Sequence, residues 1–309
     1  MPLDPKAKAL LDMTAAGPEP DWSRVTITEY RAGTAAQTLP PSTEALASIE
    51  DRVIPGPGGD LRVRVYRPAL IARLPATLFF HGGGFVACGL DSHDNICRRL
   101  SRLSGSVVIS VEYRLAPESP FPAAVDDAST ALAWVRREAL ALGIDPRRLA
   151  LAGDSAGGNL AAVTAQQDRG RDLRHQLLLY PALDPSCTAG SFREYGDAGY
   201  LLTTGMMRWF WDQYLPDPRA ATDPRAAPPH ALELHGVPSA TIITAECDPL
   251  RDEGEAYAAA LERAGVRVRL QRVHGMFHGF ASLLGFLEQA DRAVADGARA
   301  LQQAFEENA

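Results

Sequence analysis

The stretch LALAGDSAGGNLAAVTAQ, residues 149–166, passes from an apolar run through a glycine-rich turn into an alanine-rich run. The first part favours a buried strand and the last a helix, so Gly153, Ser155 and Gly157 form a G-x-S-x-G motif between the two. A serine at such a turn holds its hydroxyl clear of the sheet, and the helix directs backbone N–H groups toward developing negative charge. The alternative is a plain glycine-rich turn in which Ser155 only caps the helix.

Short β-rich runs alternate with helical patterns through most of the chain. Besides the run at 149, the strand candidates are LRVRVYR at 61, ATLFF at 76, SVVISVEY at 106, LLLYP at 177, ATIITA at 240 and VRVRLQRV at 266. Helical patterns lie between them, as in EGEAYAAALERAG at 253. This alternation predicts an α/β fold in which helices flank a mostly parallel central sheet.

Two segments do not fit the alternation. One is the N-terminal segment, and the other is rich in proline and aromatic residues and separates two strand candidates. We interpret both as parts of a cap. The predicted organisation is therefore a cap made of residues 1–45 and 186–236, on a core made of residues 46–185 and 237–309.

The second cap segment contains GMMRWFWDQYLPDP, residues 205–218. Its apolar side chains either line a substrate pocket or form the seam that packs the cap onto the sheet, and clusters at helical spacing more often pack. We assign a pocket role, together with Phe85 of the core, to Met206, Met207, Phe210 and Trp211.

Composition excludes several classes of function. The chain has 309 residues and a net charge of -7, without the basic run that would neutralise nucleic-acid phosphates. Its four cysteines form no C-x-x-C pair and are typical of small buried hydrophobes in a reducing compartment. No segment has the roughly 18 consecutive apolar residues that a membrane span needs. We expect a cytoplasmic protein without membrane insertion and with no nucleic-acid partner.

An acid and a histidine follow two further strand candidates. ATIITA leads into ECDPLRDEGEAY, with Asp248, and VRVRLQRV leads into HGMFHGF, with His278. Open α/β sheets bind ligands at the carboxyl ends of their strands. Because a serine nucleophile needs a base and the base needs an acid, Ser155, His278 and Asp248 are predicted to form a catalytic triad.

The acid has alternatives. Asp248 precedes Pro249 and could instead be the N-cap of the next helix. Glu246 and Asp252 are rival acids, but Asp248 lies in the loop directly after the strand, whereas Asp252 falls in the predicted helix. Asp248 is therefore preferred.

The base also has an alternative, because His274 lies four residues before His278. That spacing could indicate a metal pair on a helix. However, Gly275 and Gly279 disfavour a helix, no glutamate follows His274 as in H-E-x-x-H, and no third ligand cluster is visible. We expect no metal, and we prefer His278 because it lies further into the loop and can reach Ser155.

The run HGGGF, residues 81–85, places three glycines after an early strand. Glycine lets backbone N–H groups point into a space that no side chain fills, which the oxyanion of an acyl-transfer intermediate requires. We predict an oxyanion hole formed by the N–H groups of Gly83, Gly84 and Ala156. The alternative is a plain glycine turn.

In these blocks the chain resembles the hormone-sensitive-lipase-like family of α/β hydrolases. The matching blocks are HGGGF at 81, YRLAPESPFPAAVDD at 113, GDSAGGNLA at 153, DPLRDEG at 248 and HGMFHGF at 274. The resemblance implies the α/β-hydrolase fold, the same triad and oxyanion hole, a helical cap and supporting roles for His81 and Asp154. It also suggests a homodimer. Ser119 stands where this family often has histidine, a departure expected to affect local packing only.

The predicted function is that of a serine carboxylic ester hydrolase acting on short to medium acyl esters. The serine would form an acyl-enzyme that water clears, so the expected partners are a small-molecule ester and water, and no cofactor is needed. The alternatives are an amidase or deacetylase with the same triad, or a non-catalytic small-molecule receptor on the same fold.

Overall fold

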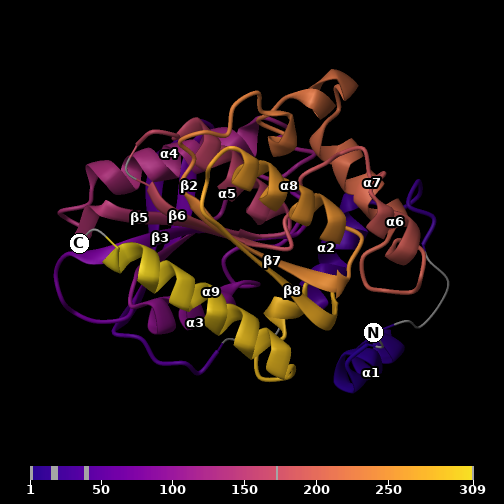
Figure 1. Cartoon of the computed structure of the whole chain (residues 1–309), viewed down its shortest axis with the longest axis horizontal. Coiled ribbons are helices and arrows are strands. Elements are labelled where there is room, and N and C mark those ends of the chain that lie inside the picture. Colours follow the sequence, from indigo (N-terminus) through magenta and orange to yellow (C-terminus); the bar gives the residue numbers. More distant parts are fainter. Residues whose placement is uncertain (1–2, 15–19, 38–41, 172, 308–309) are drawn as a thin grey trace.

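A mostly parallel sheet of eight strands runs through the computed structural model, which describes residues 3–14, 20–37, 42–171 and 173–307 (Figure 1). The strand order is β1-β2-β4-β3-β5-β6-β7-β8. The strands are β1 Ser48–Gly56, β2 Gly59–Arg67, β3 Leu74–Phe80, β4 Val107–Val111, β5 Ile144–Asp154, β6 Leu173–Leu179, β7 Ser239–Cys247 and β8 Val268–Phe277. Strands β3 to β8 pair in parallel, whereas β1 and β2 are antiparallel to their neighbours. The predicted α/β fold is confirmed.

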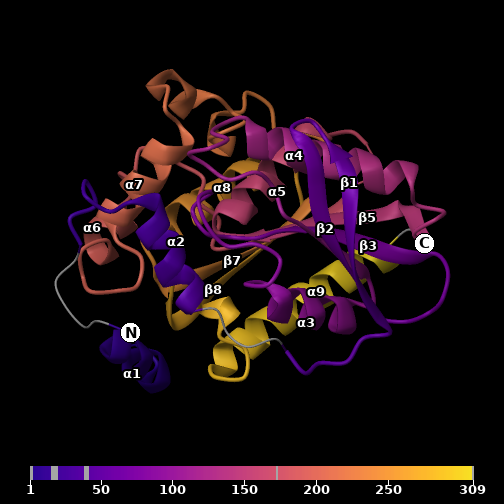
Figure 2. The same cartoon turned by 180° about the vertical axis from the view of Figure 1, so that it is seen from behind.

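Helices cover both faces of the sheet. Figures 1 and 2 show α4, α5 and α8 on one face and α3 and α9 on the other. Their bounds are α3 Asp94–Ser104, α4 Ala123–Arg137, α5 Ala156–Gln167, α8 Arg251–Arg263 and α9 Glu288–Glu306. Every residue of β3 and β4 is buried, as expected for central strands that are covered on both faces.

Apart from the short 3-10 helix η3 Phe280–Ser282, which follows β8, the remaining helices come from the two segments that the sequence assigns to a cap. They are α1 Pro5–Thr14, α2 Ile27–Ala36, α6 Gly190–Tyr195, α7 Thr204–Tyr214 and the short 3-10 helices η1 Pro218–Thr222 and η2 Pro228–His230. Helices α2, α6 and α7 gather at one end of the molecule in both views (Figures 1 and 2). Helix α2 begins at a capping box, in which Thr26 and Glu29 satisfy each other's backbone N–H groups.

Aromatic rings join the two segments to each other. The ring of Trp209 on α7 lies 5.7 Å from that of Trp22 and 5.2 Å from that of Tyr30 on α2. The ring of Tyr30 also meets that of Phe210 edge to face at 5.4 Å. Contact between these large rings, of which Trp209 and Phe210 are buried, holds α2 against α7, so segments far apart in the sequence form one wall.

The segment 186–236 has two different surroundings. Helix α7 lies beside α2, whereas the part after α7 lies on the core helix α5. There, the Asn159 side-chain amide donates to Ala226 O at 2.8 Å and the Gln166 amide to Pro228 O at 3.1 Å. The two parts of this segment therefore have different neighbours.

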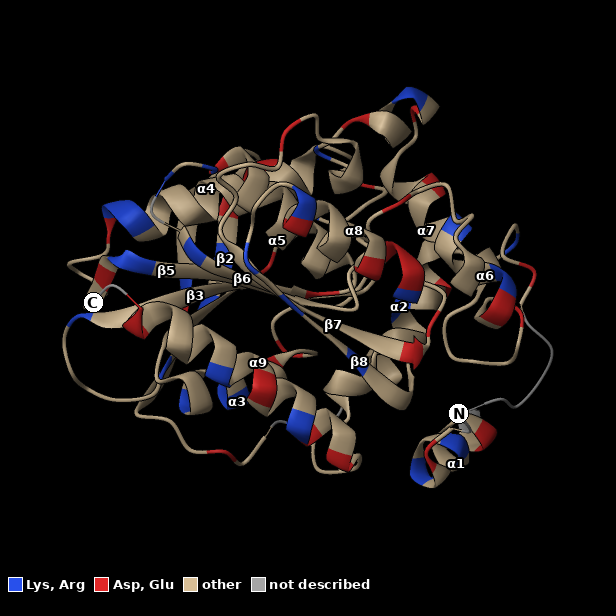
Figure 3. Cartoon of the chain, viewed as in Figure 1, with Lys and Arg blue, Asp and Glu red and all other residues tan. Residues whose placement is uncertain are grey.

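The surface and the cysteines match an ordinary globular chain. Basic and acidic segments are interspersed on the helices in Figure 3. All four cysteines are free thiols. Of the helices that the structure describes, none combines the length and the apolar character needed to cross a bilayer.

Candidate active site

Ser155 stands at a sharp turn between β5 and α5. Its backbone adopts φ 53° and ψ -120°, a conformation that non-glycine residues rarely take. The flanking glycines permit the turn, because a Cβ on Gly157 would overlap the carbonyl oxygen of Phe80, and one on Gly153 would overlap the carbonyl of Gly157. The G-x-S-x-G motif is thus required by the close approach of β3, β5 and α5.

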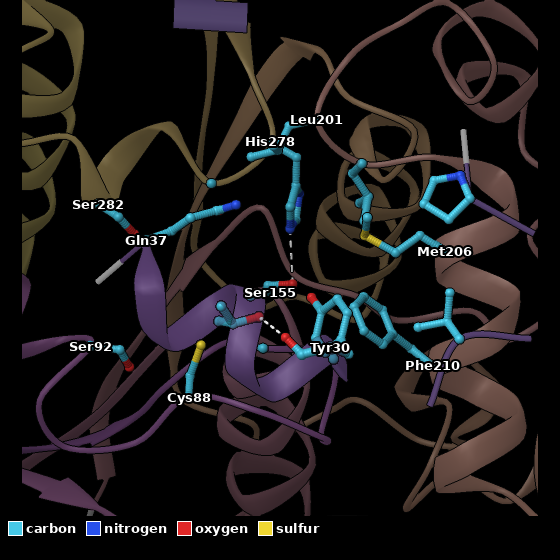
Figure 4. Close-up of a pocket in the computed structure, with 18 of the residues that line it drawn as sticks. Tyr30, Gln37, Cys88, Ser92, Ser155, Leu201, Met206, Phe210, His278 and Ser282 are labelled. Carbon is cyan, nitrogen blue, oxygen red and sulfur yellow. Dashed lines mark hydrogen bonds between the residues drawn. The ribbon is translucent and has the colours of Figure 1, made fainter. Parts of the chain in front are cut away.

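The predicted triad residues meet at the carboxyl ends of their strands. The Ser155 Oγ lies 2.9 Å from His278 Nε2, and His278 Nδ1 lies 2.8 Å from Asp248 Oδ2. Figure 4 shows the His278 ring pointing at the Ser155 hydroxyl. These are hydrogen-bond distances, so a proton can pass between serine and imidazole while the carboxylate orients the ring.

The carboxylate of Asp248 is fully buried and held on both oxygens. Its Oδ1 accepts a hydrogen bond of 2.9 Å from the backbone N–H of Leu250, which leaves Oδ2 for His278. Helix α8 begins at Arg251 with Leu250 as its N-cap, so Asp248 is not the cap residue that the sequence offered as an alternative.

The alternative acids, Glu246 and Asp252, and the alternative base, His274, make contacts outside the triad. Glu246 accepts from the backbone N–H of Gly275 at 2.8 Å, and Asp252 accepts from that of Ser191 at 2.7 Å. The His274 side chain is 58% exposed and lies 3.3 Å from Glu246. Among the described residues, no group of three or more His, Cys, Asp or Glu is placed to hold a metal ion.

The glycine run forms a tight turn after β3. The backbone N–H groups of Val86 and Ala87 both donate to Gly83 O, at 3.1 and 3.0 Å. Gly83 and Gly84 take φ angles of 109° and 61°, and side chains there would overlap Ala87 O and the ring of Phe210. Both glycines line the cavity beside Ser155, and no hydrogen bond between described residues uses their N–H groups. Ala156 follows Ser155 as the first residue of α5.

Asp154 joins the glycine turn to the serine turn. Its Oδ1 accepts from the backbone N–H of Gly82 at 2.9 Å and lies 3.1 Å from His93 Nε2. Burial alone would raise the pKa of Asp154, but His93 and the Gly82 N–H outweigh it and lower the pKa. The buried carboxylate is therefore charged and can fix the start of the turn.

His81 directly precedes the same turn and is fully buried. Its ring stacks on that of Tyr113 at 4.2 Å, and the Tyr113 hydroxyl donates to His81 O at 2.7 Å. Burial, aided by the nearby His93, lowers the pKa of His81 to about 3. The imidazole is therefore neutral at ordinary pH.

A cavity of about 1000 Å³ opens above Ser155 and His278 (Figure 4). Both segments that the sequence assigns to a cap contribute to its walls. The first supplies Trp22, Tyr30, Thr34 and Gln37, and the second supplies Leu201, Leu202, Met206 and Phe210. Most of the exposed lining is apolar, which suits an uncharged substrate.

Three of the predicted pocket residues do not line this cavity. Phe85, Met207 and Trp211 are buried, and the ring of Phe85 stacks on that of Tyr214 at 3.8 Å and packs beside that of Trp211. The prediction that all five residues line the cavity therefore needs correction for these three, whereas Met206 and Phe210 do line it. The alternative of a seam between α7 and the core fits the other side chains.

Sequence reasoning missed several residues around the site. His93 lies in the loop before α3 and contacts Asp154, and Tyr30 reaches the cavity from α2. A buried aspartate beside a nucleophile needs a partner, but nothing local in the sequence points to His93. The ring of Tyr180 meets that of His278 edge to face at 4.9 Å.

Comparisons with known proteins place this geometry among ester hydrolases. The family described as "alpha/beta hydrolase fold" matches residues 77–282. An ethyl acetate hydrolase of Pseudomonas putida is 44% identical over 80% of this chain and 79% of its own length. The carboxylesterase NlhH of Mycobacterium tuberculosis is 39% identical over 98% of this chain and 96% of its own. The structure of a hyperthermophilic esterase from the archaeon Pyrobaculum calidifontis superposes with a TM-score of 0.92 at 43% identity, covering 98% and 99% of the two chains.

Proposed function

We propose that Ser155, His278 and Asp248 are the catalytic triad of this chain. The proposal proceeds from the finding that the chain belongs to the hormone-sensitive-lipase-like family of α/β hydrolases and is a carboxylesterase. The observation that carries the proposal is the pair of hydrogen bonds at 2.9 and 2.8 Å through the His278 ring. The substrates we propose are esters with short to medium acyl chains.

In the first half of the reaction, the Ser155 Oγ attacks the ester carbonyl carbon while His278 Nε2 takes the hydroxyl proton. The carbonyl oxygen becomes an anion, which the N–H groups of Gly83, Gly84 and Ala156 would stabilise. The intermediate then collapses, the bond to the alkoxy oxygen breaks, and His278 returns the proton to the leaving alcohol. The products of this half are the free alcohol and an acyl-serine.

Water completes the cycle. His278 Nε2 accepts a proton from a water molecule as its oxygen attacks the acyl carbon, and a second tetrahedral intermediate forms. Its collapse breaks the bond to Ser155 Oγ, which recovers the proton from His278 and releases the carboxylic acid. Throughout, the buried Asp248 carboxylate stabilises the imidazolium form. These steps use the ester, water, and this chain's own side chains and backbone N–H groups.

The walls next to Ser155 support a short to medium acyl group. Phe210 packs against Gly84, and Met206 precedes it by one helical turn, so the space beside the glycine turn is narrow. The name of the Pseudomonas relative, an ethyl acetate hydrolase, points to the same size class. The rest of the cavity leaves room for a larger alcohol group.

A panel of p-nitrophenyl esters from acetate to palmitate tests the proposal, with Ser155→Ala as the control. We expect kcat/KM to peak at butyrate or hexanoate and the variant to be inactive. A flat panel from folded wild-type protein would contradict the substrate class. Amide analogues of the esters, including acetamides, are assayed in the same panel. Faster cleavage of the amides than of the esters would favour the amidase or deacetylase alternative. Saturable binding of an ester without turnover would favour the receptor alternative.

Two further predictions concern the protein outside its site. The family resemblance suggests a homodimer, which light scattering of the purified protein would test. The cysteine pattern suggests a cytoplasmic location, which fractionation of the source cells would test.

A further inference from the structure

Helix α2 contributes to the site in a second way, through Arg31. The neighbouring Tyr30 and Thr34 line the cavity, whereas Arg31 is absent from its lining and extends to the core. The Arg31 side chain is about one third exposed, so its contacts are partly shielded from water.

The guanidinium of Arg31 makes two hydrogen bonds to core carbonyls. Its Nε donates to Val86 O at 2.7 Å, and one terminal nitrogen donates to Ala116 O at 3.0 Å. Both terminal nitrogens also donate to Glu118, each at 2.7 Å, in a bidentate pair. One side chain of the N-terminal segment thus bridges two loops of the core that lie 55 and 85 residues away.

The two carbonyls belong to the support of the glycine turn. Val86 is a member of that turn, and its own N–H donates to Gly83 O at 3.1 Å. The second loop is tied to the same turn, because the N–H of Ala116 donates to Phe85 O at 2.9 Å. Arg31 therefore holds the backbone segment that carries the N–H groups of Gly83 and Gly84, and it does so from the side away from the cavity.

We propose that Arg31 is a positioning residue for the oxyanion hole, which holds the glycine turn through Val86 O and Ala116 O. The inference rests on the proposed roles of Gly83 and Gly84. Donors must stand in the right place before charge develops, and a misplacement of about 1 Å can cost about 10² in rate. Helix α2 then affects the chemical step itself as well as the shape of the cavity.

The competing explanation is that Arg31 only docks α2 onto the core. Loss of the side chain would then loosen the cavity wall, and only substrates long enough to touch α2 would react differently. Acetate, the smallest acyl group, separates the two explanations, because it can occupy the space next to Ser155 without reaching the wall.

The chain offers a matched control. Glu118→Gln removes the charge of the ion pair but leaves the bonds of Arg31 to Val86 O and Ala116 O. Since the Glu118 side chain is 61% exposed, we expect its loss to change kcat by less than about twofold. Arg31→Gln loses the ion pair and cannot span both carbonyls, and Arg31→Ala loses every contact.

We would measure kcat and KM on p-nitrophenyl acetate and hexanoate for these variants, together with their melting temperatures. The proposal predicts that kcat on acetate falls about 10- to 100-fold in Arg31→Ala and less in Arg31→Gln, with KM on acetate within about twofold of wild type. Arg31→Lys, which can still reach one carbonyl, should recover part of the loss.

The proposal is overturned if Arg31→Ala keeps the wild-type kcat on acetate and changes only the hexanoate constants. If Arg31→Ala does not fold, the same test is made by comparing kcat on acetate between Arg31→Gln and Glu118→Gln. Equal kcat values in these two variants would overturn the proposal. Activity in a parallel Ser155→Ala sample would instead refute the proposed function, so the two failures can be told apart.

Discussion

The carboxylate of Asp154 accepts a hydrogen bond of 2.9 Å from the backbone N–H of Gly82, across 72 residues of sequence. Asp154 directly precedes Ser155, and Gly82 directly precedes Gly83. The bond therefore fixes the distance between the proposed nucleophile and the proposed oxyanion donors. Stabilisation of an oxyanion depends on this distance, because the donors must meet the oxygen at the position it takes in the transition state.

Asp154→Ala should lower kcat on p-nitrophenyl butyrate about 10- to 100-fold, because the glycine turn loses its tie to the serine turn. Asp154→Asn keeps an oxygen that can accept from Gly82 and should lose less. Steady-state kinetics with circular dichroism as the check on folding would measure both. A fully active Asp154→Ala enzyme would show that the bond has no role in placing the donors.

Gly157→Ala should abolish the fold or lower its stability by more than about 4 kcal/mol, because the added Cβ would overlap the carbonyl oxygen of Phe80 in a buried turn. Gly33→Ala is the control, since a Cβ there meets no atom within 4 Å. Chemical denaturation of the two variants gives the comparison. Equal stability of both variants would refute the close approach of α5 and β3.

Phe210→Ala should move the ester preference toward longer chains, because the ring lies against Gly84 on one wall of the cavity. The ratio of kcat/KM on octanoate to that on butyrate should rise about tenfold. Met207→Ala is the matched control on the same helix, because Met207 is buried without lining the cavity. It should lower stability but leave the ratio unchanged. The account fails here if the two variants shift the preference equally.

Glu253 should make stability depend on pH. Its Oε1 accepts from Leu183 N at 2.6 Å, and burial raises the pKa of its carboxyl well above the ordinary 4.5. A group whose pKa is higher in the folded state stabilises the fold below its unfolded pKa, and this contribution is lost as pH rises toward the folded pKa.

Glu253→Gln keeps an oxygen for Leu183 N and is neutral at every pH. The melting temperature of the variant relative to wild type should therefore be higher at pH 8 than at pH 5. Thermal scans of both proteins at the two pH values measure this difference. A difference that is the same at both pH values would mean that Glu253 does not titrate between them.

The sequence predicts the sheet and the meeting of Ser155, His278 and Asp248 for one physical reason. Each of these residues follows a recognisable strand, and a parallel sheet brings the carboxyl ends of its strands to one edge. The order of the strands was not needed. The glycine run could be interpreted for the same reason, because three successive glycines have no use in strand packing.

The pocket could not be assigned in the same way. Met206 and Phe210 form one i, i+4 stripe on α7, and Met207 and Trp211 form the next stripe beside it. Both stripes are apolar, so periodicity alone does not say which of them faces the cavity. The choice is made by tertiary packing, where the rings of Phe85 and Tyr214 pack beside that of Trp211 in the second stripe.

The supporting contacts are also beyond sequence reasoning. His93 meets Asp154, and Arg31 meets Val86, over separations of 61 and 55 residues. A histidine before a helix and an arginine in an N-terminal helix are ordinary surface residues by every local criterion. Only the folded chain brings them to the two turns of the site.

The most direct test of the central claim is to find which residue forms the covalent intermediate. We would treat the protein with diethyl p-nitrophenyl phosphate, which phosphorylates an activated serine, and locate the adduct by mass spectrometry of peptides. The account predicts one diethylphosphoryl group on Ser155, loss of esterase activity in step with labelling, and no labelling of Ser155→Ala or His278→Ala. An adduct on another residue, or full esterase activity in Ser155→Ala, would contradict it.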